Sequence, residues 1–182
     1  MSVNYFPLTL SNLEVIQQEL YSKYSHLATG DKLQTLKIDW TLENFLSLYA
    51  PIQELVTKYG TSVRAARFFY TPNGVELEPH VDGKDITDHY WALNVPVKVE
   101  SENHYQEWFD YTGEMRFDSN QVYTDSIKPK EPEKLVLIDK LLLTTPHFVK
   151  VGIFHKVINN SGHGRFILSI RFTDPRFIMI LK

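Results

Sequence analysis

Residues 151–172 read VGIFHKVINNSGHGRFILSIRF, two apolar or alternating segments joined by a stretch rich in turn residues. The joining residues 159–164, NNSGHG, are typical of a turn because asparagine, serine and glycine adopt positive φ or bond to nearby backbone. Segments of this kind on either side of such a turn predict a β-hairpin with a slightly long loop.

Placing Asn159 opposite Arg165 in this hairpin sets His155 opposite Ser169, with all four side chains on one face of the sheet. His155 interrupts an otherwise apolar segment, where an inward-facing polar ring needs a partner. The register predicts an imidazole and a guanidinium pointing into the same space. Each residue also has a simpler interpretation, His155 as a satisfied strand histidine and Arg165 as a solvated strand end.

A second segment far upstream, EPHVDG at residues 78–83, offers His80 and Asp82 two positions apart. On a strand these two side chains share a face, so they can hold one metal ion together. A histidine and an aspartate at this spacing often occur by chance, and a surface loop is the alternative. The preceding turn residues and Gly83 favour a strand that ends at a site. His147, next to Pro146, competes with His155 as a third ligand.

Composition limits the classes of protein that the chain can belong to. Its 182 residues are 43% hydrophobic and 23% charged, which predicts a single globular domain spanning residues 1–182. A net charge of −3 gives no reason to expect nucleic-acid binding. The absence of cysteine excludes disulfides and thiolate ligands. No apolar run approaches the ~20 residues that span a bilayer, and the N-terminus is unlike a signal peptide, so we expect a cytoplasmic protein without membrane contact.

Helical patterns occupy roughly residues 1–60 and strand patterns dominate residues 63–172. Ser11 and Glu14 predict a capping box for the first helix, Thr41 is expected to cap a second, and Pro51 to open a third. Strands are expected at residues 5–10, 63–70, 76–81, 89–99, 106–111 and 135–143 and in the final hairpin. Helices followed by a run of strands indicate an α+β fold, with helices packed outside a sheet sandwich or barrel.

Two histidines and one carboxylate form the facial triad that is characteristic of non-haem Fe(II) oxygenases. Together with YTPNGVELEPHVDG (70–83), WALNVPV (91–97) and HKVINNSGHGRFILSIRF (155–172), the order of these residues resembles the Fe(II)/2-oxoglutarate-dependent oxygenase superfamily. The last phrase is most similar to the aspartyl/asparaginyl β-hydroxylase-like and prolyl-hydroxylase-like branches. The former often has glycine where this chain has Asp82. The resemblance implies a double-stranded β-helix, or jelly roll.

The resemblance also implies roles for individual residues. His80, Asp82 and His155 would bind Fe(II), and Arg165 would pair with the distal carboxylate of the cosubstrate 2-oxoglutarate. Further candidates for contact with the cosubstrate are, in order of chain position, Arg67, Tyr70, Asn94 and Ser169, while Arg171 is a second candidate for pairing with its carboxylate. The implied reaction hydroxylates an unactivated C–H bond and releases succinate and CO₂.

Two other classes of protein stay open at this point. A cupin-like metal protein with another activity would keep the triad without needing Arg165, and a non-enzymatic jelly-roll module would bind no metal. The substrate is expected to be an amino acid, a peptide side chain or a small metabolite. Aromatic residues between 90 and 111 are candidates for lining its pocket, and Asp85 and Asp88 for attracting a cationic substrate. The sequence does not indicate the oligomeric state.

Overall fold

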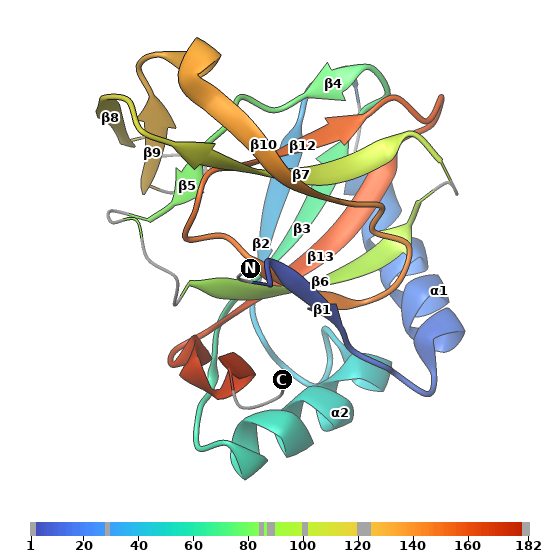
Figure 1. Cartoon of the computed structure of the whole chain (residues 1–182). Coiled ribbons are helices and arrows are strands. Elements are labelled where there is room, and N and C mark those ends of the chain that lie inside the picture. The colour runs from blue at the N-terminus through green and yellow to red at the C-terminus, as the bar shows by residue number, and fades with distance from the viewer. Residues whose placement is uncertain are drawn as a thin grey trace.

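The computed structural model describes residues 3–27, 30–83, 86, 90–99, 102–119 and 125–179, and two facing antiparallel sheets form its centre (Figure 1). The larger sheet has six strands in the order β1 (Tyr5–Pro7), β11 (His147–Lys150), β6 (Trp91–Lys98), β13 (Arg165–Phe172), β3 (Val63–Thr71) and β2 (Gln34–Ile38). The facing sheet has four strands in the order β10 (Leu135–Leu141), β7 (His104–Tyr111), β12 (His155–Asn159) and β4 (Val75–Glu76). A third sheet joins β5 (Val81–Asp82), β9 (Asp125–Pro129) and β8 (Met115–Ser119).

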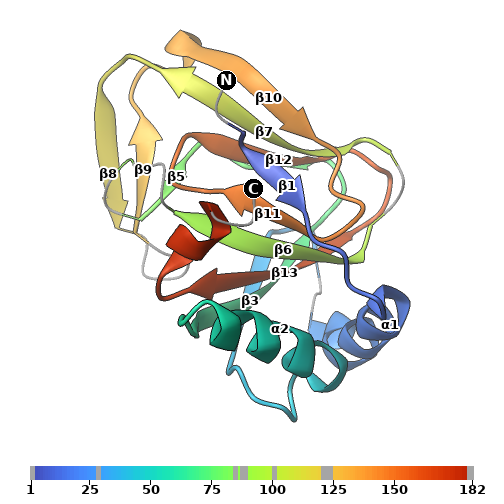
Figure 2. The ribbon, with the colours of Figure 1, turned by 60° about the horizontal axis from the view of Figure 1, so that its bottom comes forward.

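Two helices, α1 (Leu13–Tyr24) and α2 (Leu46–Lys58), cover the outer face of the six-stranded sheet (Figure 2). Each helix buries residues at a spacing of four, the periodicity of one helical face. These buried residues are Ile16, Leu20 and Tyr24 in α1 and Leu48, Ile52 and Val56 in α2. Short 3₁₀ segments occur at Ser25–Leu27, Pro132–Lys134 and Pro175–Met179. No helix in the described part of the chain has the length and apolar character needed to cross a membrane.

The central strand β13 divides the interior into two parts. Its even positions from 166 to 170 pack into the core beneath the helices, whereas its odd positions from 165 to 171 line a cavity between the sheets. This alternation follows from the two-residue period of a strand. The same strand therefore contributes an apolar face to the fold and polar side chains to the cavity.

The α+β fold with a jelly-roll core and helices outside it, predicted from the sequence, is confirmed. The expected hairpin at residues 151–172 is wrong, because β12 pairs with β7 and β4 while β13 pairs with β3 and β6. The connection between β12 and β13 crosses from one sheet to the other. Apolar and polar residues alternate along a strand in the same way whether the next strand of the chain pairs with it or lies in the facing sheet. The pattern alone therefore did not distinguish a hairpin from a connection between the two sheets.

The helix starts also differ from the prediction. Asn12 occupies the N-cap of α1 without a side-chain bond, so the capping box at Ser11 is absent. Pro51 lies inside α2, and one helix replaces the two expected around it. An interior proline costs about 3 kcal/mol, and the stripe from Leu48 to Val56 offsets this cost by burying apolar side chains on both sides of the proline. Strands β2, β8, β9 and β11 were not predicted.

Candidate metal centre and anion pocket

The three predicted ligands meet on neighbouring strands. His80 forms an isolated antiparallel bridge with His155, and each backbone N–H donates to the other residue's carbonyl at 2.9 Å. Asp82 follows in β5, two residues after His80. One ligand atom from each of these residues lies within 4.8 Å of the other two, which is close enough for a single ion to contact all three.

Both imidazoles are held in the tautomer that a metal requires. The Nδ1 atom of His80 lies 2.8 Å from the Glu78 carbonyl, and that of His155 lies 3.0 Å from the Ile153 carbonyl. A carbonyl oxygen only accepts, so in each ring Nδ1 carries the proton and donates it. The lone pair of Nε2 is then available to a metal ion. Burial, followed by the charge of His80, lowers the pKa of His155 to about 4, so its ring is neutral at pH 7.

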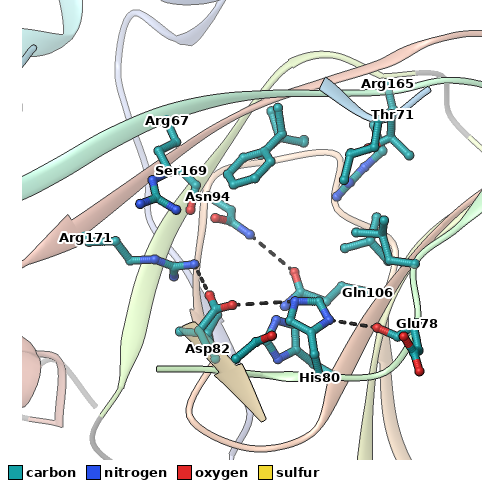
Figure 3. Close-up of a pocket in the computed structure, with 18 of the residues that line it drawn as sticks. Arg67, Thr71, Glu78, His80, Asp82, Asn94, Gln106, Arg165, Ser169 and Arg171 are labelled. Atoms are coloured by element: carbon teal, nitrogen blue, oxygen red, sulfur yellow. Dashed lines mark hydrogen bonds and ion pairs between the residues drawn. The ribbon is translucent and has the colours of Figure 1, made fainter. Parts of the chain in front are cut away.

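Asp82 is oriented by an arginine on β13, in the six-stranded sheet. The Nη2 atom of Arg171 donates to Oδ2 of Asp82, while Oδ1 lies 3.5 Å from Nε2 of His80 (Figure 3). Burial would raise the pKa of Asp82, but nearby positive charge, mostly from Arg171, lowers it below its usual value. Asp82 therefore stays ionised, with one oxygen engaged by Arg171 and the other directed toward the histidines.

The triad opens into a cavity of about 280 Å³ between the two main sheets. Its walls are partly apolar, with Leu33, Phe69, Leu77, Val151, Val157 and Ile167. Its rim carries a network of charges, in which Lys128 contacts Glu78 at 2.8 Å and Asp118 at 2.7 Å. This size is close to the lower end of the range for small-molecule sites, roughly 300–1,000 Å³.

Arg165 lies in the same cavity, at the start of β13 and six residues before Arg171. Its side chain is buried, and among the described residues its Nε has no hydrogen-bond partner. Burial lowers the pKa of Arg165 to about 10, so the guanidinium is still charged at pH 7. Thr71 is its cross-strand neighbour on β3 and lines the cavity beside it (Figure 3). A buried cation with an unused donor indicates a binding site for an anion.

Asn94 and Ser169, two of the candidates for contact with the cosubstrate, also line the cavity. They are cross-strand partners on β6 and β13. The side-chain amide of Asn94 donates to Oε1 of Gln106 at 3.3 Å. The Oδ1 atom of Asn94 is buried and has no partner among the described residues. Arg67 lines the cavity as well. Tyr70 does not, because it faces the helices and packs on Phe166.

Several sequence-based candidates lie elsewhere. His147 is not part of the His80, Asp82 and His155 cluster found among the described residues, although its Nδ1, like those of the two histidines, bonds a carbonyl two residues earlier, that of Thr145, at 2.8 Å. The aromatic residues expected to line a pocket are absent from the described lining. Trp108, for example, is a core residue whose indole donates to the Lys150 carbonyl at 2.7 Å. Asp85 and Asp88 lie outside the described residues.

Sequence reasoning missed the partners that surround the site. The alternation of β3, with Arg67, Phe69 and Thr71 on one face, would have identified Thr71. Nothing local predicts that Gln106 faces the cavity or that Arg171 pairs with Asp82, 89 positions away.

Asn159 fixes the connection that leads into Arg165. Its buried side chain donates to the carbonyls of Thr71 at 2.8 Å and His163 at 2.7 Å, and it accepts from the Ser161 hydroxyl at 2.7 Å. Gly164 approaches the Tyr70 ring so closely that a Cβ would collide with it. These contacts tie the end of β12 to β3 and bring Arg165 into register with Thr71.

Replacing Asn159 with alanine should lower the free energy of unfolding by about 2–3 kcal/mol, since it leaves buried carbonyls without donors. Urea denaturation followed by circular dichroism measures the change. Asn160→Ala is the matched control, because the side chain of Asn160 is exposed, and it should alter stability by less than about 0.5 kcal/mol. Equal urea concentrations at the midpoint of unfolding for the two variants would contradict this role of Asn159.

Among known proteins, the comparison found solved structures that are similar to this chain. No protein-family model matches the sequence, and no curated protein does. A viral collagen prolyl hydroxylase from Paramecium bursaria chlorella virus 1, solved with 2-oxoglutarate, is 13% identical with a TM-score of 0.52, covering 94% of this chain and 96% of that chain. A prolyl-4-hydroxylase from Pseudomonas putida is 12% identical with a TM-score of 0.54, covering 93% and 91%.

A third similar structure is the epimerase SnoN from nogalamycin biosynthesis, in complex with Fe³⁺ and α-ketoglutarate. It is 14% identical with a TM-score of 0.60, and the match covers 93% of this chain and 78% of that one. At these identities the similarity shows a shared fold. The three neighbours are two prolyl hydroxylases and an epimerase, and the cluster of His80, Asp82 and His155 could hold a metal ion in this chain.

Proposed function

We propose that the protein is an Fe(II)- and 2-oxoglutarate-dependent dioxygenase that hydroxylates an unactivated C–H bond of an amino acid, a peptide side chain or a small metabolite. One observation carries the proposal: a two-histidine, one-carboxylate cluster and a buried arginine with an unused donor share one cavity. The fold shared with prolyl hydroxylases and with SnoN supports the same function.

The residues present fit both groups. Two imidazole nitrogens and one carboxylate oxygen on one side of an ion leave its other positions open, as a non-haem Fe(II) oxygenase needs. The Arg165 guanidinium suits a carboxylate, which it can bind through two parallel N–H donors. A dicarboxylate that reaches from the metal to Arg165 would satisfy both the open positions and the unused donor.

Each side chain then has a defined task. His80 and His155 present Nε2 because backbone carbonyls hold their Nδ1 protons, and Arg171 turns Oδ1 of Asp82 toward them. Arg165 orients the cosubstrate by its distal carboxylate. Iron and 2-oxoglutarate, when bound, supply the oxidative decarboxylation and the activation of O₂. The apolar walls of the cavity exclude water from the reacting atoms.

Arg165 separates this proposal from the two alternatives. A metal-dependent isomerase or hydrolase on the same fold has no need for a buried cation next to the triad, and a non-enzymatic module needs neither feature. Burying an arginine that has an unsatisfied donor is costly, and the Nε of Arg165 has no partner among the described residues. Its presence in the cavity therefore favours a function that uses an anionic cosubstrate.

Anaerobic titration of the protein with Fe(II) and 2-oxoglutarate tests the proposal. We expect a metal-to-ligand charge-transfer band that saturates at one equivalent of each, followed on exposure to O₂ by formation of succinate. With a substrate present, mass spectrometry should show a product that has gained one oxygen atom. Absence of the band in the wild-type protein would rule out this function. A product that is an isomer of its substrate would show that the protein catalyses a reaction other than hydroxylation.

A further inference from the structure

The cavity has a second cationic end, at the level of Ser169 and Arg171 on β13 and away from Arg165. Arg67 on β3 lies opposite Ser169 on β13, and Arg171 follows two residues later on the same face (Figure 3). Arg165 and Thr71 occupy the other end of these two strands. A cosubstrate that reaches from the metal to Arg165 would leave the end around Arg67 for another molecule.

This end carries more positive than negative charge. Arg171 pairs with Asp82, and Arg67 lines the same cavity from the neighbouring strand, opposite Ser169. The other carboxylates on the described cavity lining, Glu78 and Asp118, are held at the rim by Lys128. Asp82 is thus the one carboxylate on the described lining that faces these two guanidiniums, and it contacts Arg171.

An unused donor remains at this end. Nη1 of Arg171 is buried without a hydrogen-bond partner among the described residues. Arg67 has an interaction of its own within the chain, and its guanidinium lines the cavity from the neighbouring strand. A buried N–H donor beside a second guanidinium suits an oxygen of a carboxylate.

We propose that the Arg67 end of the cavity binds a carboxylate of the substrate, so that the substrate is a small organic acid. The inference rests on the proposed function, because it assigns the Arg165 end to 2-oxoglutarate. Arg67 is the specificity-determining residue, since Arg171 already holds Asp82. The apolar side chains of the lining suit the carbon skeleton of such an acid. A cationic substrate would find no comparable site on the described lining, because Lys128 and Arg116 already pair with the two carboxylates at the rim, Glu78 and Asp118.

Matched acids and amides test this inference even while the natural substrate is unidentified. Isobutyrate and benzoate are titrated calorimetrically into the anaerobic Fe(II)–2-oxoglutarate complex, alongside isobutyramide and benzamide. We expect each acid to bind at least about tenfold more tightly than its amide, the difference that one charge-assisted contact provides. Arg67→Gln should remove this preference. Arg64→Gln is the matched control and should retain it, because Arg64 lies three residues away on β3 with an exposed side chain.

The possible outcomes separate the inference from the proposed function. If the wild-type protein gives no charge-transfer band, the proposed function fails. If the band forms but the acids do not bind, or bind no better than the amides, the carboxylate site is excluded while the proposed function stands. A preference that survives Arg67→Gln would also overturn the inference. So would a large loss of 2-oxoglutarate affinity in that variant, because it would assign Arg67 to the cosubstrate.

Discussion

Replacing His155 with alanine should abolish the charge-transfer band and the turnover of 2-oxoglutarate. The variant removes one of three ligand atoms from the cluster, and His80 and Asp82 alone make a poor chelate. Loss of an outer partner of a metal ligand typically costs 10- to 100-fold in affinity, so we expect loss of the ligand itself to weaken binding by at least about 100-fold. Calorimetric titration with Mn(II) in place of Fe(II) measures this change independently of activity.

His147 provides an unusually close control. Like His155, it is buried on a strand and its Nδ1 bonds the carbonyl two residues before it, but it lies outside the cluster. His147→Ala should therefore retain metal affinity within about threefold, even if both variants lose similar stability to heat. Metal binding that depends on His147 and not on His155 would refute the assignment of the third ligand.

The candidate ligands were predictable because much of their geometry is local. His80 and Asp82 need only an extended backbone to share a face, and His155 was identified as a polar ring within an apolar segment. The hairpin used to place His155 near Arg165 was nevertheless wrong. Both side chains still line one cavity, because strands that face each other across a sandwich, like paired strands, direct alternate residues into the same interior.

Features that depend on long-range pairing were not predictable. The contact between Arg171 and Asp82 requires β5 and β13 to face each other, and the rim network requires the β8 and β9 pair to lie next to Glu78. Neither arrangement leaves a pattern in the local sequence. For this reason Arg171 could only be grouped with Arg165 as a possible anion partner. The structure separates them, since Arg171 is engaged by Asp82 whereas Arg165 lies at the other end of the cavity, opposite Thr71.

Replacing Arg165 with glutamine should weaken 2-oxoglutarate binding by roughly 100- to 1,000-fold while leaving the affinity for the metal alone within about threefold. The variant removes a buried cation from the end of the cavity and leaves the ligand cluster intact. Truncating one partner of a buried charge pair typically costs about 3–5 kcal/mol, because the remaining charge is left uncompensated. Titration of the charge-transfer band with 2-oxoglutarate measures the effect.

A cosubstrate analogue shows whether this loss arises at the distal carboxylate. 2-Oxopentanoate keeps the keto acid that would chelate the metal but has a methyl group in place of that carboxylate. The wild-type protein should therefore prefer 2-oxoglutarate strongly, and Arg165→Gln should reduce the preference to less than about tenfold, mainly by weakening 2-oxoglutarate. Arg165→Lys should recover part of the preference, since lysine restores the charge without the paired donors. An undiminished preference in Arg165→Gln would assign the distal carboxylate to another residue.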